Sequence, residues 1–245
     1  MSGHSKWAGI KHKKAIIDAK KGKVFTRIIR ELTIAARQGG GSVDTNVRLR
    51  KAVDDSRNAN MPSDNVRKAI QRGTGELPGI NYEELVYEGY GPSGVAVMVE
   101  ATTDNKNRTH SEIKKIFSSH GGNLGDTGCV GWMFHPKGII VIEKSKISEN
   151  DIMNLALDSG AEDVNTDDET FYEIVTLPSE FEKVKTALKD KNIAVESSEI
   201  SMIPSTYIKL EGEDARKMIA LIEELEGHED VKNSYSNFDI PEEAI

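Results

Sequence analysis

Apolar residues in the first third of the chain recur with the period of amphipathic helices. Over residues 24–38 they fall on one side of a helix drawn at 100° per residue, and basic residues fall on the other side. Three glycines at 39–41 end this helix. Segments at about 46–59 and 64–72 show the same spacing. The pattern therefore predicts a small three-helix bundle over residues 23–72.

The predicted bundle carries basic side chains on its outer surface. Pro62 breaks the chain before the third helix, Ser63 is well placed as its N-cap, and Asp64 falls in its first turn. The outward basic positions of the three helices are Lys23, Arg27, Arg30, Arg37, Arg48, Arg50, Lys51, Arg57, Arg67, Lys68 and Arg72.

After a linker at 73–79 that is rich in glycine, the period changes to that of strands. Strands are predicted at 82–90, 95–102 and 130–134, with a helix at 109–119 between the second and the third. This part of the chain has the order β-β-α-β, so it lacks a second helix.

From residue 138 the elements follow the order β-α-β-β-α-β, which is the split βαβ, ferredoxin-like arrangement. The strands are predicted at 139–142, 163–165, 170–177 and 194–201, and the helices at 149–159 and 179–189. Beyond Pro204, a strand, a helix and a last strand are predicted at 206–210, 214–226 and 231–238.

These elements predict an α+β multidomain protein. An N-terminal three-helix bundle with its basic tail occupies residues 1–79, and two ferredoxin-like α/β domains follow. The middle domain is discontinuous, formed by 80–137 and 204–245, because the C-terminal elements supply the helix that the earlier segment lacks. Residues 138–203 form a domain inserted between them.

The net charge of −8 hides a division between the two ends of the chain. Residues 1–79 contain 17 basic and 7 acidic groups, whereas residues 80–245 contain 15 basic and 33 acidic groups. A phosphate backbone would attract the first part and repel the second. The acidic domains would then face a protein partner or a second copy of the chain.

Two features of the sequence indicate the cellular compartment. The single cysteine, Cys129, excludes an internal disulfide and fits a reducing compartment. The chain has no run of about eighteen apolar residues, and its N-terminus lacks the apolar core of a signal peptide. We therefore expect a cytoplasmic protein with no membrane partner.

The first thirty residues hold nine Lys or Arg against one acid, Asp18. The first half of this segment has too few apolar residues to bury a face, so it cannot offset the entropy of ordering by packing. Such a segment is typical of a polyanion contact, although a solvated terminus is the plain alternative. The predicted nucleic-acid-binding residues are His4, Lys6, Trp7, Lys11, His12, Lys13, Lys14, Lys20, Lys21, Lys23, Arg27, Arg30, Arg48, Arg50, Lys51 and Arg57.

Three residues of this set have alternative interpretations. Trp7 either stacks on a base or packs against the bundle, and the sequence does not choose between them. His4 and His12 lie among lysines, which disfavour a metal cation, so hydrogen bonds to phosphate or base are the remaining functional interpretation.

No other pattern supports catalysis, a metal or a cofactor. The glycine-rich stretches at 89–94 and 121–128 lack the context of a phosphate-binding loop, and no Gly-Lys-Ser or Gly-Lys-Thr is present. Neither Cys129 nor the nearby histidines show the spacing of metal ligands. We therefore predict a protein that is not an enzyme and has no small-molecule substrate.

Several motifs together resemble the YebC/PmpR family. They are GHSKW at 3–7, IKHK at 10–13, KGK at 21–23, NVRLR at 46–50, ANMP at 59–62, RGTG at 72–75, YEGYGP at 87–92 and GGNLG at 121–125. One departure is Cys129, where the family more usually has serine. The resemblance implies a helical N-terminal domain, two α/β domains with the middle one discontinuous, and a cytoplasmic, non-enzymatic regulator of gene expression.

Family members are generally described as DNA-binding transcriptional regulators, and others, including mitochondrial relatives, as translation factors at the ribosome. The resemblance thus favours a DNA-binding transcriptional regulator. The thin basic tail favours a ribosome-associated translation factor that contacts rRNA, since nothing in the sequence is seen to read base edges. A protein-interaction module is the third hypothesis.

Overall fold

The computed structural model describes residues 21–240, with side chains from Lys23 onward. The chain forms two compact units. The N-terminal unit contains residues 21–127 and 217–234 of the described chain, and the C-terminal unit contains residues 128–216 and 235–240.

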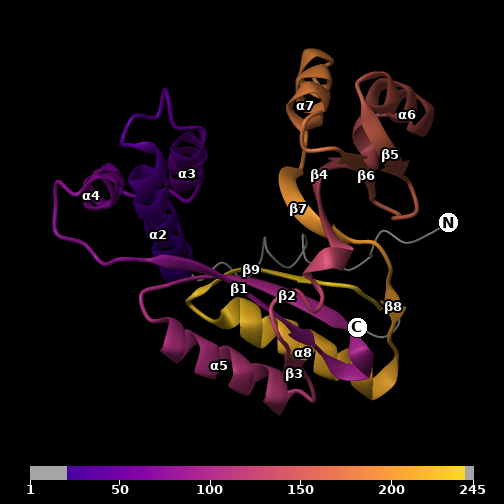
Figure 1. Cartoon of the computed structure of the whole chain (residues 1–245). Coiled ribbons are helices and arrows are strands. Elements are labelled where there is room, and N and C mark those ends of the chain that lie inside the picture. The colour runs from indigo at the N-terminus through magenta and orange to yellow at the C-terminus, as the bar shows by residue number, and fades with distance from the viewer. Residues whose placement is uncertain (1–20, 241–245) are drawn as a thin grey trace. The chain divides into compact units, whose positions relative to one another are not determined.

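The N-terminal unit begins with three helices, α2 (Lys21–Gly39), α3 (Val47–Asn58) and α4 (Ser63–Thr74) (Figure 1). All three predicted helices are therefore present, each within a few residues of its predicted range. Their apolar faces meet in one core, which consists of Leu32, Ala35, Ala36, Leu49, Ala52, Met61 and Ala69.

Close backbone approaches and one asparagine fix the packing of these helices. The Asn46 side chain accepts a hydrogen bond from the Leu49 amide (3.0 Å) and donates to the carbonyl oxygen of Ala35 (2.8 Å). It thereby caps α3 and holds it to the end of α2. A Cβ atom at Gly73 would lie 2.4 Å from the carbonyl oxygen of Thr33, so only glycine allows α4 to approach α2 this closely.

The predicted cap of α4 is wrong. Ser63 is the first residue of the helix, Pro62 occupies the N-cap position, and no side chain caps the helix there. Proline suits the start of a helix because its φ is already fixed near the helical value and it has no amide hydrogen to satisfy.

The sheet of the N-terminal unit has the order β3-β1-β2-β9. Its strands are β1 (Glu83–Tyr90), β2 (Ala96–Thr103), β3 (Asn123–Leu124) and β9 (Val231–Ser236). A short 3-10 turn, Pro92–Gly94, joins β1 to β2. Helices α5 (Lys106–Ser119) and α8 (Gly212–Gly227) run side by side along one face of the sheet (Figure 1).

This strand order shows how β9, which is far from β2 in the sequence, can join the same sheet. In a ferredoxin-like sheet the chain order across the sheet is 4-1-3-2, with helices after the first and third strands. Here strands one, two and four are β2, β3 and β9, and the two helices are α5 and α8. Strand three is replaced by β1, which comes before them in the chain. The sheet is therefore a permuted version of the predicted one.

The strand predicted at 130–134 is wrong. Residues Gly131–Met133 form a 3-10 turn, and β4 (Phe134–Glu143) begins after it. The predicted last strand also divides, into β9 and β10 (Phe238–Asp239), and β10 pairs in parallel with β8 (Ile208–Lys209).

The C-terminal unit contains a second four-stranded sheet of β4, β5 (Ala161–Asn165), β6 (Phe171–Thr176) and β7 (Ser197–Pro204) in the order β5-β6-β4-β7. In it β4 pairs with β6 and β7, and β5 pairs with β6. All its pairs are antiparallel. With α6 (Glu149–Asp158) and α7 (Phe181–Asp190), these strands follow the chain order β-α-β-β-α-β. A short 3-10 helix, Lys144–Lys146, precedes α6.

The core of this second sheet consists of Ile140, Ile142, Ile152, Ala156, Val164, Tyr172, Ile174, Phe181, Val184 and Leu188. The protein is thus of the α+β class, with two antiparallel four-stranded sheets in the described chain. The domain boundaries given above stay a prediction. Within residues 21–240, none of the helices combines the length and apolar character that crossing a membrane requires.

Candidate nucleic-acid interface

Half of the predicted nucleic-acid contacts lie outside the described residues. These are His4, Lys6, Trp7, Lys11, His12, Lys13, Lys14 and Lys20, and the side chain of Lys21 is likewise not described. The remaining predicted residues lie on α2 and α3.

The cations of α2 bind the end of another helix. Lys23 donates to the carbonyl oxygen of Gly227, and Arg27 donates to that of Glu226. Arg30 donates to the carbonyl oxygen of Glu229 (2.6 Å), just beyond α8. The spacing i, i+4, i+7 places all three side chains on one face of α2.

These contacts have a simple electrostatic cause. The last carbonyls of a helix have no partner within the helix and carry the negative end of its dipole. The last turn of α8 contains no basic residue of its own. The three cations of α2 therefore supply the C-terminal charge compensation that the sequence of α8 lacks.

Arg30 also pairs with a buried carboxylate. Its Nη1 lies 2.9 Å from Oδ1 of Asp230, whose side chain is fully buried, and Arg30 itself is only 8% exposed. On the other oxygen, Asp230 accepts from Arg108 (2.9 Å) and Thr109 (2.7 Å). The expectation that Arg30 lies on an exposed outer face is therefore wrong.

The two arginines determine the charge state of Asp230. Burial by itself would raise the pKa of this carboxyl group, but the hydrogen bonds from Arg108 and Thr109 and the charge of Arg30 lower it. A buried carboxylate held by two guanidinium groups joins α2 and α5 at one point.

Arg48 belongs to a second internal network. Its guanidinium contacts Glu31 and Glu84, each at 2.6 Å, and Lys232 contacts Glu31 at 2.9 Å. Burial opposes ionisation of Glu31, yet the bonds from Arg48 and Lys232 outweigh it and lower the pKa of Glu31 to about 2. Arg48 thus links α3 to α2 and to β1.

Six cations of α3 and α4 remain exposed, and we call them the bundle cations: Arg50, Lys51, Arg57, Arg67, Lys68 and Arg72. Arg57 pairs with its neighbour Asp54, and Arg67 and Lys68 pair with Asp64, all on the surface. Such exposed pairs contribute little and can be exchanged for another anion. Arg50 donates to the carbonyl oxygens of Val43 and Asp44 in the loop before α3.

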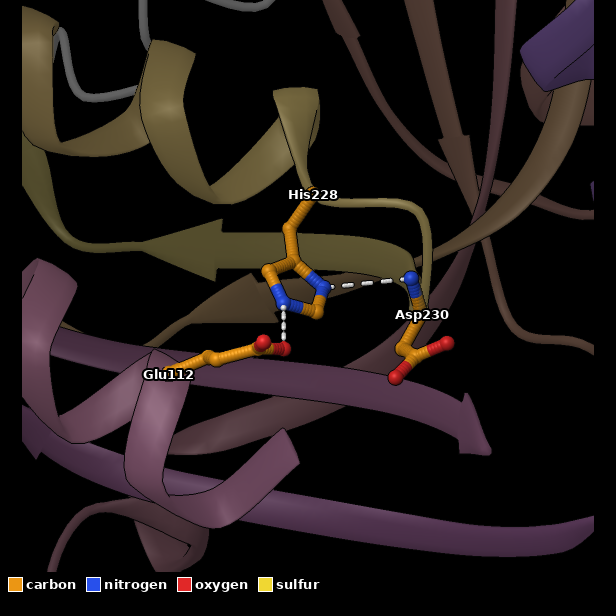
Figure 2. Close-up of side chains that lie close together, drawn as sticks. All are labelled: Glu112, His228 and Asp230. Carbon is orange, nitrogen blue, oxygen red and sulfur yellow. Dashed lines mark hydrogen bonds and ion pairs between the residues drawn. The ribbon is translucent and has the colours of Figure 1, made fainter. Parts of the chain in front are cut away.

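Asp230 and two residues near it have the residue types of a metal site. Ligand atoms of Glu112, His228 and Asp230 lie within 4.8 Å of one another, and Figure 2 shows the imidazole of His228 between the other two residues. Nδ1 of His228 accepts from the Asp230 amide (3.1 Å), so Nε2 carries the proton and donates to Glu112 (2.9 Å).

The surroundings disfavour a cation here. Both carboxylate oxygens of Asp230 already contact arginines. The adjoining cleft of about 560 Å³ is also lined by Lys23 and Arg108. A metal would have to displace the buried guanidinium of Arg30 from Oδ1 of Asp230 and the guanidinium of Arg108 from Oδ2, and Glu112 and His228 already bond to each other. The arrangement orients Glu112 through His228.

Two family models match the chain. The model described as TACO1/YebC protein N-terminal domain matches residues 5–76, and the one described as TACO1/YebC second and third domain matches residues 82–238. The chain belongs to the TACO1/YebC family.

Relatives of the TACO1/YebC family support this assignment over the whole length. A protein of Endomicrobium trichonymphae named "Probable transcriptional regulatory protein" is 58% identical and is matched over 100% of this chain and 98% of its own length. A protein of the same name from Dictyoglomus turgidum is 53% identical, with the same coverage. The crystal structure of a conserved hypothetical protein from Aquifex aeolicus matches with a TM-score of 0.83 at 45% identity, covering 97% of this chain and 98% of that one.

The resemblance to the YebC family that the motifs indicated is thus confirmed. The pattern of residues did not indicate the Asp230 cluster of this TACO1/YebC protein. Asp230 is separated by 122 residues from Arg108 and by 200 from Arg30, so no local spacing connects them. The sequence feature that could have indicated this cluster is the row of basic residues on one face of α2, because such a row needs partners of opposite charge.

Proposed function

We propose that the protein is a non-enzymatic regulator of gene expression that binds nucleic acid through its bundle cations and its basic N-terminal segment. In its simplest form it is a DNA-binding transcriptional regulator. The names of the relatives from Endomicrobium trichonymphae and Dictyoglomus turgidum support the regulatory part of this proposal.

One observation carries the binding part. The exposed surfaces of α3 and α4 hold six cations against the carboxylates of Asp54, Asp55 and Asp64. Residues 1–20 add five lysines against Asp18. Cations that are not consumed by internal pairs can neutralise phosphates and release counterions, which is the main source of affinity for nucleic acid.

A first experiment measures binding of the full-length protein to a labelled random-sequence DNA duplex at several salt concentrations. In the variant Lys51→Gln, Arg57→Gln, Arg72→Gln, the slope of log affinity against log salt should fall by roughly 2–3, because each lost phosphate contact removes about 0.9. The matched control is Lys183→Gln, Lys189→Gln, Lys191→Gln, which removes three exposed lysines at α7.

An unchanged slope in the α3/α4 variant would mean that the bundle cations do not touch phosphate. Charge reversal at Lys13 and Lys14 tests the N-terminal segment separately, and retained affinity there would count against its role. Because these variants leave Arg30 and Arg48 intact, their effect on binding is not confounded with loss of the internal networks.

The alternative is a ribosome-associated translation factor whose N-terminal segment contacts rRNA. It is favoured by that segment's composition, since a chain without spaced apolar residues can enter a narrow RNA-lined space that a folded domain cannot. Crosslinking in cells followed by sequencing of bound DNA and RNA together separates the two. Recovery of one set of promoters supports transcription, and recovery of large-subunit rRNA supports translation.

A further inference from the structure

Among the four α-helices that the structure describes in the acidic part of the chain, α7 has a small positive balance of three bases to two acids, and α5 has the largest. It contains four cations, Lys106, Arg108, Lys114 and Lys115, and a single carboxylate, Glu112. By contrast, α6 has three acids and no base, and α8 has five acids and two bases. A concentrated positive surface on an otherwise acidic region indicates a specific partner of negative charge.

The three lysines of α5 differ from Arg108 and from Lys23, Arg27 and Arg30 of α2, all of which have internal partners. Lys106, Lys114 and Lys115 are exposed, and none of the three has an ion-pair partner among residues 21–240. On α7, by comparison, Lys183 and Lys185 pair with Glu180 and Glu182. The three lysines of α5 therefore keep their full charge available to a ligand.

The exposed face of α5 also has the composition of a phosphate contact. At 100° per residue, about half of the helix circumference is free of carboxylates, and beside buried Phe117 it carries Lys106, Asn107, His110, Ser111, Lys114, Lys115 and Ser118. All seven of these polar residues are exposed. The ring of His110 contacts that of Tyr87 at one edge of this half. Lysine, serine and asparagine side chains are the usual donors to the phosphate and sugar groups of nucleic acids.

The position of Glu112, the only carboxylate of α5, lies outside this face. Glu112 lies on the flank of the helix, where it accepts from Nε2 of His228 at 2.9 Å (Figure 2). Arg108, on the same flank, is held by Asp230 and Asp104. The cluster with metal-like residue types thus holds Glu112 and Arg108 on the flank, and the exposed side chains of the outer face are cationic or polar.

The same cluster joins α5 to the bundle. Asp230 contacts Arg30 of α2 through Oδ1 and Arg108 of α5 through Oδ2, each at 2.9 Å. Because α5 and the bundle share this buried carboxylate, the cations of both belong to one compact unit. Their relative positions therefore do not depend on how the two units are arranged.

We propose that the outer face of α5, carrying Lys106, Lys114 and Lys115, is a second phosphate-contacting surface for the nucleic acid. The proposal rests on the proposed function, since the ligand is the same polymer. It assigns to α5 a sequence-independent role: the helix adds affinity and fixes orientation, and it does not read bases.

The test compares the full-length protein with the variant Lys106→Gln, Lys114→Gln, Lys115→Gln. Binding to a labelled DNA duplex and to an RNA of the same length is measured between about 50 and 200 mM salt. The slope of log affinity against log salt should fall by roughly 2–3 on DNA. The α7 variant Lys183→Gln, Lys189→Gln, Lys191→Gln removes the same charge and should keep the wild-type slope, and unchanged urea unfolding of both variants confirms that they are folded.

A second readout locates the contact directly. A photo-crosslinking amino acid at Ser111 or Ser118, on the α5 face, should attach to the nucleic acid, and the same group at Lys191 should not. If the α5 variant keeps the wild-type slope and neither serine position crosslinks, while the α3/α4 variant loses slope, the α5 surface is refuted and the proposed function stands. If the wild-type protein binds neither DNA nor RNA, both proposals are refuted.

Discussion

Helices α2 and α5 are both basic, and the structure uses their charge in opposite ways. Lys23, Arg27 and Arg30 on α2 are bound to carbonyl groups at the end of α8, and Arg30 also pairs with buried Asp230. Lys114 and Lys115 on α5 are exposed and have no ion-pair partner among residues 21–240. Basic residues on a helix therefore indicate either an internal electrostatic joint or an external surface, and burial and partners distinguish the two.

The largest effect is expected when one of the internally bound cations of α2 is removed. Arg30→Met leaves Asp230 buried with one of its two arginines missing, and loss of one partner of a buried ion pair costs about 3–5 kcal/mol of unfolding free energy. Urea denaturation measures this cost. Arg57→Gln on the surface of α3 is the counterpart and should leave unfolding unchanged while weakening nucleic-acid binding. Equal unfolding free energies for the Arg30→Met variant and the wild type would contradict the assignment of Arg30 as an internal joint.

The second expectation concerns acid. Glu31 has a pKa of about 2 in the folded protein, well below the value of an unperturbed glutamate, and the pKa of Glu84 and of Asp230 is also lowered. Groups with a lowered pKa stabilise the folded state above their unfolded pKa, and this stabilisation is lost as the pH falls through the folded pKa. Stability should therefore decline as the pH falls from about 5 to about 2.

Denaturation midpoints across that pH range test this expectation. In Glu31→Gln the decline should be shallower, because one of the titrating groups has been removed. A variant that declines as steeply as the wild type would show that the Glu31 network does not hold the bundle to β1 and β9.

The smallest effect is expected at Lys23, which combines the internal contact of the α2 cations with the exposure of the α5 lysines. Its side chain is exposed, yet it donates to Gly227 at the negative end of the α8 dipole. Lys23→Gln should cost about 0.3–1 kcal/mol of unfolding free energy, the usual contribution of a cation at a helix C-terminus. The slope of log affinity against log salt should fall by at most roughly 0.9. A larger fall in this slope would mean that Lys23 belongs to the nucleic-acid surface and not to the internal joint.

Much of the fold could be predicted because it depends on local periodicity. The apolar spacing of residues 24–38 identified α2, and the β-α-β-β-α-β order from residue 138 agrees with the elements of the second sheet. The prediction failed at 130–134, where a run containing Val130, Trp132 and Phe134 suggested a strand. Residues 131–133 instead form a turn that leads into β4, and the period of two does not distinguish a short turn from a short strand.

The candidate interface was predicted less completely. The sequence identified the basic residues of α2, α3 and the N-terminal segment, but it treated the charge of α2 as external. The lysines of α5 were not predicted as a contact surface, because they lie in a part of the chain, residues 80–245, whose 33 acidic residues outnumber its 15 basic ones.

By itself, the sequence determined most of the helices and strands, which family the chain resembles, and that its charge is strongly divided. The tertiary structure alone decided which of those charges face solvent. The reason is physical: the partners of Arg30 are a carboxylate and backbone carbonyls some 200 residues away, brought together only when α8 and β9 pack beside α2 and β2. Carbonyl groups at a helix end carry charge in every sequence, so no residue pattern reveals which cations they will bind.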